Sequence, residues 1–127
     1  MKRKIDEHQV SLEIFQALID TGIPANILGY RYLKKALMMA VEDPDVVLKP
    51  KERIYQPLAD EHHCTASDVQ QAIRRAITVG KERSKPEILQ QYYGYTDKAP
   101  KTGEYIAQVA EKICIRLNID SLVESNI

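Results

Sequence analysis

Two histidines and a cysteine follow two carboxylates in the middle of the chain, in the stretch DEHHC from Asp60 to Cys64. Such side chains bind zinc or form a thiol–histidine catalytic pair. Two zinc ligands on a helix stand four residues apart, because that spacing puts both on one face, whereas adjacent residues such as His62 and His63 point about 100° apart. Cys64 has no second cysteine within four residues, and no third group can be assigned to orient a nucleophile. We therefore predict no metal site, no catalytic residue and no cofactor.

The same stretch is better explained as the end of one helix and the turn before the next. A short helix over residues 54–61, a turn at His62–Cys64 and a longer helix from Thr65 have the spacing of a helix-turn-helix. Thr65 and Asp68 are spaced as in a capping box, which begins a helix. In proteins that bind DNA, this motif places its second helix in the major groove.

The outer face of this second helix carries side chains that can contact nucleic acid. Glutamine can pair with adenine through two hydrogen bonds, and arginine can pair with guanine in the same way. The polar residues on this face are Asp68, Gln70, Gln71, Arg74, Arg75, Thr78 and Lys81. Helical proteins that bind no DNA also contain such angles and polar faces. Spacing alone therefore leaves both interpretations open.

Charge is unevenly distributed along the chain. The formal net charge is zero, yet residues 71–101 carry seven Lys/Arg against three Asp/Glu. Local charge matters more than the total for attracting a polyanion, so the neutral total does not exclude nucleic acid.

The elements that position these residues are predicted to be helices. Apolar residues recur at helical spacing in five or six segments, and no strand pattern competes with them. The first helix, which stops at Gly22, is predicted to pack through Leu12, Phe15, Leu18 and Ile19. The other predicted helices open at Pro24, near Glu52, at Thr65, at Ser84 and at Thr102, and residues 43–51 form a loop broken twice by proline.

Length and composition favour one soluble helical domain. The chain has 127 residues, of which 44% are hydrophobic and 28% are charged. It contains no run of about 18 apolar residues, and its basic start lacks the apolar region of a secretory signal. Cys64 and Cys114 form no disulfide framework, which favours a reducing cytoplasm. We predict an all-α domain over residues 11–118, built around the helix-turn-helix, between tails at 1–10 and 119–127.

Four blocks of the chain resemble a known family. GIPANILGYRYLKKAL (22–37), YQPLADEHHCTASDVQQAIRRAI (55–77), YGYT (93–96) and GEYIAQVAEKI (103–113) occur in the order seen in the C-terminal effector domain of the response regulator that initiates sporulation in Firmicutes. The resemblance implies a six-helix bundle around a helix-turn-helix. It also implies binding to a short DNA box, often as tandem dimers, and activation or repression of transcription.

The resemblance extends to individual positions of the recognition helix. Ser67 and Arg74 match the family there and are candidates for DNA contact, whereas Asp68, Gln70 and Gln71 stand where the family carries Arg, Glu and Arg. These changes predict a different DNA preference. We expect bases to be read by Ser67, Gln70, Gln71 and Arg74, and phosphates to be held by Thr65, Arg75, Lys81, Lys98 and Lys101.

Two further expectations concern the chain as a whole. No phosphorylatable receiver domain precedes this region, so the chain is either a fragment of a longer regulator or a stand-alone effector. The expected partners are double-stranded DNA, a second copy on tandem sites, and RNA polymerase or a related regulator; the expected location is the cytoplasmic nucleoid. The alternative is a helical interaction module that modulates a related regulator and has little DNA affinity, which the neutral total charge and the three altered positions favour.

Overall fold

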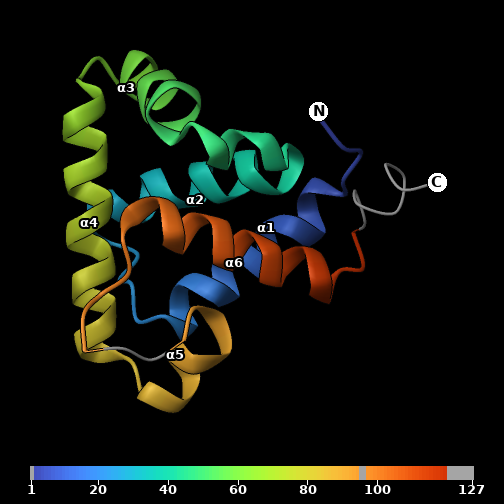
Figure 1. Cartoon of the computed structure of the whole chain (residues 1–127), viewed down its shortest axis with the longest axis vertical. Coiled ribbons are helices and arrows are strands. Elements are labelled where there is room, and N and C mark those ends of the chain that lie inside the picture. The colour runs from blue at the N-terminus through green and yellow to red at the C-terminus, as the bar shows by residue number, and fades with distance from the viewer. Residues whose placement is uncertain (1, 95–96, 120–127) are drawn as a thin grey trace.

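The chain folds into an arrangement of helices, seen in a computed structural model that describes residues 2–94 and 97–119 (Figure 1). Over these residues there are six α-helices, one 3-10 helix, one π-helical turn and no strand, which confirms the predicted all-α fold. Residues 120–127, most of the predicted C-terminal tail, lie outside the described ranges. The elements are α1 (Glu7–Asp20), α2 (Leu28–Glu42), η1 (Pro44–Leu48), η2 (Lys51–Tyr55), α3 (Gln56–His62), α4 (Ala66–Arg83), α5 (Pro86–Tyr92) and α6 (Thr102–Arg116).

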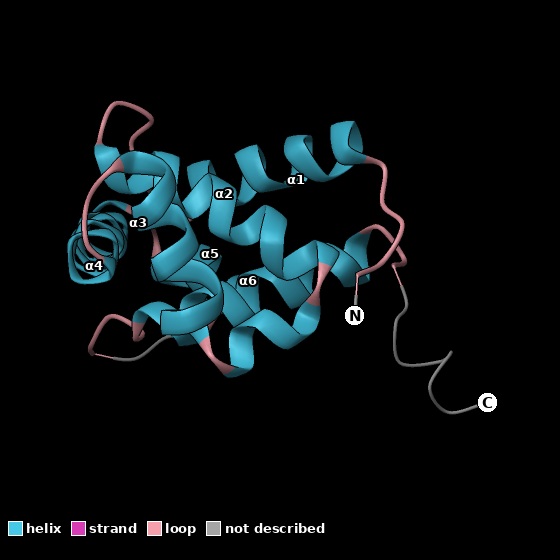
Figure 2. Cartoon of the chain, turned by 90° about the horizontal axis from the view of Figure 1, so that it is seen from above, coloured by secondary structure: helices cyan, strands magenta, loops and turns pink. Residues whose placement is uncertain are grey.

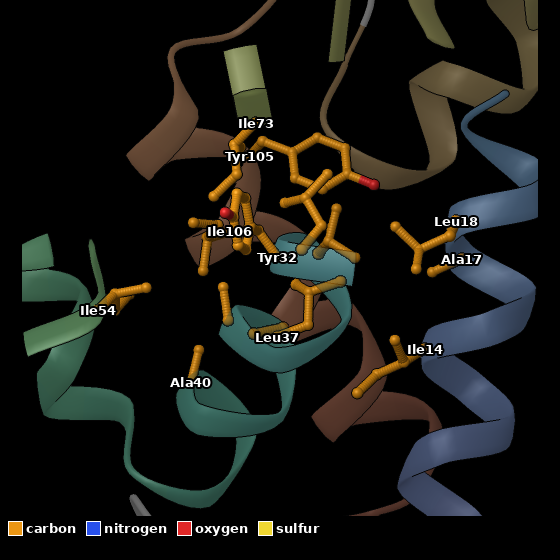
Figure 3. Close-up of a cluster of buried hydrophobic side chains, with 14 of the residues drawn as sticks. Ile14, Ala17, Leu18, Tyr32, Leu37, Ala40, Ile54, Ile73, Tyr105 and Ile106 are labelled. Carbon is orange, nitrogen blue, oxygen red and sulfur yellow. The ribbon is translucent and has the colours of Figure 1, made fainter. Parts of the chain in front are cut away.

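Helix α2 is the centre of the packing, with α1, α4 and α6 against it. Figure 1 shows α4 running along one side of the molecule, across the ends of α2 and α6, and Figure 2 looks nearly along its axis. Figure 3 shows Leu18 of α1, Leu37 of α2, Ile73 of α4 and Ile106 of α6 in one buried cluster. The core therefore fixes α4 while leaving one of its faces free.

The predicted inner face of α1 is wrong except at Leu18. Leu12, Phe15 and Ile19 are 55%, 49% and 49% exposed. The buried residues are Val10, Ile14, Ala17 and Leu18. The sequence of α1 contains two apolar stripes at helical spacing, and the one that includes Ile14 packs on α2 and α6.

Helix α1 also begins earlier than predicted. The Asp6 carboxylate accepts hydrogen bonds from the backbone N–H groups of His8 (3.0 Å) and Gln9 (3.3 Å), so it caps a helix that starts at Glu7. Residues 7–10, predicted as part of a tail, are therefore helical.

Helix α2 starts at Leu28, four residues after the predicted start at Pro24. Its buried face contains Tyr30, Leu33, Leu37, Ala40 and Val41, which recur at helical spacing in the sequence. Within the predicted loop the chain forms η1, and the predicted third helix is the turn η2 continued by α3.

Two glycines let α4 pack closely on its neighbours. A Cβ atom at Gly29 of α2 would lie 2.3 Å from the carbonyl oxygen of Ala72, and one at Gly80 would lie 2.2 Å from that of Thr21. No larger side chain fits at either point without displacing backbone. The position of α4 along its length is thus set by backbone contact with α2 and with the α1–α2 turn.

The sequence predicted that Ser84 begins a helix, but in the structure Ser84 ends α4. Its hydroxyl donates a hydrogen bond to the backbone carbonyl of Asp20 (2.6 Å), and the N-cap of α5 is Lys85. The Tyr92 hydroxyl donates to the Asp20 carboxylate at 2.5 Å. Asp20 therefore ties α5 and the end of α4 to α1.

Candidate nucleic-acid interface

The turn between α3 and α4 has the form predicted for a helix-turn-helix. His63 follows α3 in the left-handed conformation (φ 57°, ψ 46°), which commonly ends helices. The Cys64 N–H then donates to the Ala59 carbonyl at 2.9 Å. His63 therefore redirects the chain, and α4 begins three residues after it.

A capping box starts α4, as predicted. The Asp68 N–H donates to the Thr65 hydroxyl (3.0 Å), and the Thr65 N–H donates to the Asp68 carboxylate (3.1 Å). Val69, one residue further on, is fully buried in the core. The first turn of α4 is therefore stabilised by its own side chains, and the Asp68 carboxylate helps to cap the helix.

Three of the DEHHC side chains, those of Glu61, His62 and Cys64, contact α2. Lys35 forms an ion pair with Glu61, and its ammonium lies 3.3 Å from the His62 Nε2 atom. The His62 ring meets Tyr32 edge to face, with centroids 5.2 Å apart, and the Tyr32 hydroxyl lies 3.7 Å from the Cys64 sulfur. The arrangement holds the turn against α2.

Charge and burial shift two pKa values in this cluster. The Lys35 ammonium lowers the pKa of the Glu61 carboxyl, chiefly through their hydrogen bond. Burial, and then the contact with Cys64, raises the pKa of Tyr32. Among the residues that the structure describes, no group of three or more His, Cys, Asp or Glu side chains is arranged to hold a metal ion.

The outward face of α4 brings together most of the residues predicted to read bases. Ser67, Gln71 and Arg74 are exposed, and the Gln71 amide donates to the Ser67 hydroxyl at 3.1 Å. Arg75 and Thr78 are also exposed, and the Thr78 hydroxyl donates to the Arg74 carbonyl at 3.0 Å. The face thus presents amide, hydroxyl and guanidinium groups on one rigid helix.

Gln70 lies to one side of this face. It is half-buried and lines a hollow of about 670 Å³ between α4, the 48–55 segment and the start of α6. At this hollow the Tyr55 hydroxyl and the Thr102 hydroxyl are hydrogen-bonded at 2.7 Å. Burial raises the pKa of Tyr55, which this bond and the charge of Arg74 oppose. Gln70 therefore occupies a different environment from Ser67, Gln71 and Arg74.

The residues predicted to contact phosphates are spread more widely. Arg75 is on the outward face, while Lys81, near the end of α4, is half-buried. Lys98 and Lys101 are exposed in the connection from α5 to α6, of which residues 95–96 lie outside the described ranges. The Lys101 N–H donates to the Glu104 carboxylate at 3.1 Å. Lys49 and Lys51, which precede α3, also line the hollow. They were not among the predicted phosphate contacts because they lie in a segment predicted to be a loop.

Comparison with known protein families identifies a match that covers most of the chain. The model described as the C terminus of the sporulation initiation factor Spo0A matches residues 14–113, from α1 through the helix-turn-helix to α6. This confirms the resemblance noted in the sequence. In the described part of the chain, no helix combines the length and apolar character needed to span a membrane.

Proposed function

The chain belongs to the family of the Spo0A C-terminal domain, and from this premise we propose that it binds double-stranded DNA sequence-specifically and regulates transcription. The observation that carries the proposal is the outward face of α4. Ser67, Gln71 and Arg74 stand exposed on a helix whose first turn is capped and whose opposite face is buried.

In the proposed complex, α4 enters the major groove with its capped end first. Ser67, Gln71 and Arg74 reach base edges, and Gln70 faces the side of the groove. Arg75 and the exposed Lys98 and Lys101 contact phosphates, which fix the register of the helix without reading sequence. Thr65 and Lys81 are the remaining phosphate candidates. The Thr65 hydroxyl accepts the cap bond and retains its own proton to donate.

The proposal includes partners and location. Family membership favours two copies on tandem sites, contact with RNA polymerase or a related regulator, and a place on the cytoplasmic nucleoid. Gln70 and Gln71 stand where the sporulation response regulator carries charged residues, so we expect the preferred DNA box to differ. No catalytic role is proposed.

Selection from a pool of random duplexes at two salt concentrations tests the proposal. A DNA-binding regulator should enrich one motif, and its affinity for that motif should fall steeply with salt, because each protein–phosphate contact releases counterions. If no motif is enriched and no duplex is bound even at low salt, the proposal is rejected.

A second candidate function is favoured by α1. Leu12, Phe15 and Ile19 form an exposed apolar stripe, the kind of surface that mediates contact between proteins. An interaction module that modulates a related regulator would use this stripe and have little DNA affinity. Such a module should bind that regulator at any salt concentration, and Phe15→Glu should abolish the binding; a Phe15→Glu variant that binds it normally would reject this candidate.

A further inference from the structure

The hollow beside α4 is lined by three lysines from two segments distant in sequence. Lys49 follows η1, Lys51 is the first residue of η2, and Lys101 directly precedes α6. All three are exposed, and within the described residues none of them forms an ion pair. The hollow therefore gathers positive charge that the described fold does not neutralise by pairing.

Two carboxylates also line the hollow, and one of them is already bound. Glu104 accepts a hydrogen bond from the backbone N–H of Lys101 and so caps α6. Glu52 is exposed at the start of η2. With three ammonium groups against two carboxylates, the lining retains a positive charge. The Tyr55 and Thr102 hydroxyls bond to each other there, which gives the hollow a neutral polar wall.

The hollow adjoins the proposed DNA-reading helix. Gln70 of α4 lines it directly, and Arg74, one helical turn further on, is close enough to influence the Tyr55 hydroxyl. When a helix lies in the major groove, the phosphates of the two strands pass along its sides. A positively charged hollow on one side of α4 thus lies where one of these strands would pass.

We propose that Lys49, Lys51 and Lys101 form a phosphate-binding hollow that seats the DNA backbone alongside α4. This inference rests on the proposed function and adds Lys49 and Lys51, which precede the helix-turn-helix, to its phosphate contacts. Lysine suits this role, because its ammonium is a flexible point charge that contacts phosphate without strict geometry. Phosphate contacts of this kind raise the affinity for all DNA sequences equally and fix the register in which α4 reads bases.

The test compares three proteins by fluorescence anisotropy over a salt series: the parent chain, Lys49→Ala/Lys51→Ala, and the control Lys2→Ala/Lys4→Ala. The control removes the same charge from exposed positions near the N-terminus, which Figure 1 shows on the opposite side of the molecule from α4. Each protein is titrated with the selected duplex and with an unrelated duplex.

We expect Lys49→Ala/Lys51→Ala to weaken binding to both duplexes by the same factor. The slope of log affinity against log salt should become shallower by about 1 to 2, because each lysine that binds a phosphate contributes about one to it. The control should match the parent in both respects. If the parent binds DNA and Lys49→Ala/Lys51→Ala binds both duplexes with the parent's affinity and slope, the hollow is not a backbone seat, while the proposed function stands.

A second measurement separates a DNA phosphate from free phosphate. The backbone amides of Gly103 and Gln70 are followed by NMR while inorganic phosphate or duplex is added. A backbone seat predicts shifts with duplex, reduced in Lys49→Ala/Lys51→Ala, and no saturable shift with inorganic phosphate. Saturation by inorganic phosphate would assign the hollow to a free anion and overturn the backbone seat. A parent that binds no duplex at low salt overturns both the seat and the proposed function.

Discussion

Individual side chains of α4 divide into those that hold the helix and those that face away from the molecule. Asp68 belongs to the first group, because its carboxylate accepts the Thr65 N–H. Ser67, Gln71 and Arg74 belong to the second. Asp68 stands where the resembling family carries arginine, so one family position that could contact DNA is here used to cap a helix. If α4 binds DNA as proposed, it does so with fewer cationic side chains, and cationic residues outside α4 should contribute more to the affinity.

Arg74 and Arg75 give a matched pair of substitutions. If Arg74 reads a base and Arg75 holds a phosphate, Arg74→Ala should cost about 1–3 kcal/mol on the selected duplex and blur one position of the motif. Arg75→Ala should weaken binding to selected and unrelated duplexes alike and make the salt dependence shallower. Anisotropy with both duplexes measures these effects. Equal losses on the two duplexes for Arg74→Ala would contradict its role in reading bases.

The cap of α4 gives a prediction about stability. Thr65→Ala removes the hydroxyl that accepts the Asp68 N–H, and we expect it to lower the free energy of unfolding by about 0.5–2 kcal/mol. Thr78→Ala is the control, because the exposed Thr78 hydroxyl bonds only to a carbonyl within the same helix. Urea unfolding should show a clear loss for the first variant and little change for the second. Similar losses of unfolding free energy for both variants would contradict a stabilising role of the cap.

Close backbone packing of α4 gives a second prediction at the level of the helices. Gly80→Ala forces a Cβ atom to within 2.2 Å of the Thr21 carbonyl, so we expect it to lower the free energy of unfolding by about 1–3 kcal/mol. Gly103→Ala is the matched control: its Cβ would lie 3.6 Å from Pro50, an ordinary contact, and alanine favours the helix. Thermal unfolding should separate the two variants. A Gly80→Ala protein as stable as the parent would refute the tight packing.

Sequence periodicity predicted where most helices lie, but not always which face they bury. The inner faces of α2, α4 and α6 follow from a single apolar stripe each. Helix α1 has two such stripes, and the choice between them depends on its tertiary neighbours. Ser84 looks like a helix start because serine often caps, yet its hydroxyl bonds to Asp20, 64 residues earlier. Hydrogen bonds over such a distance leave no signal in local sequence.

Across the whole molecule, the helix-turn-helix was predictable and the hollow was not. The spacing of Thr65 and Asp68 and the apolar stripe after them are local signals, and they place Ser67, Gln71 and Arg74 correctly on one face. The hollow needs residues 48–55, Gln70 and the start of α6 to meet. That meeting is set by packing of the core, so no spacing in the sequence indicates it.

Buried tyrosines make the folded molecule sensitive to alkaline pH. Burial raises the pKa of Tyr92 to about 12, assisted by its hydrogen bond to Asp20, and burial raises that of Tyr93 to about 12. The folded state therefore holds these protons more tightly than the unfolded chain, where the pKa is about 10. Their contribution to stability is complete below about pH 10 and is lost as the pH rises towards about 12.

Urea unfolding at several pH values checks this expectation with Tyr92→Phe. The variant lacks the Asp20 hydrogen bond and should be less stable than the parent below about pH 10. Above that pH its stability should fall less steeply than the parent's, because one titrating group is gone. Parallel curves for the two proteins would contradict the assignment of the alkaline loss to Tyr92.

If the outward face of α4 binds duplex DNA, NMR mapping with the selected duplex should locate the contact on that face. We expect the largest shifts at Ser67, Gln71 and Arg74 and at the adjoining hollow, and we expect them to diminish as salt is added. Shifts confined to the α1 stripe of Leu12, Phe15 and Ile19, or absent along α4, would contradict DNA binding by this face.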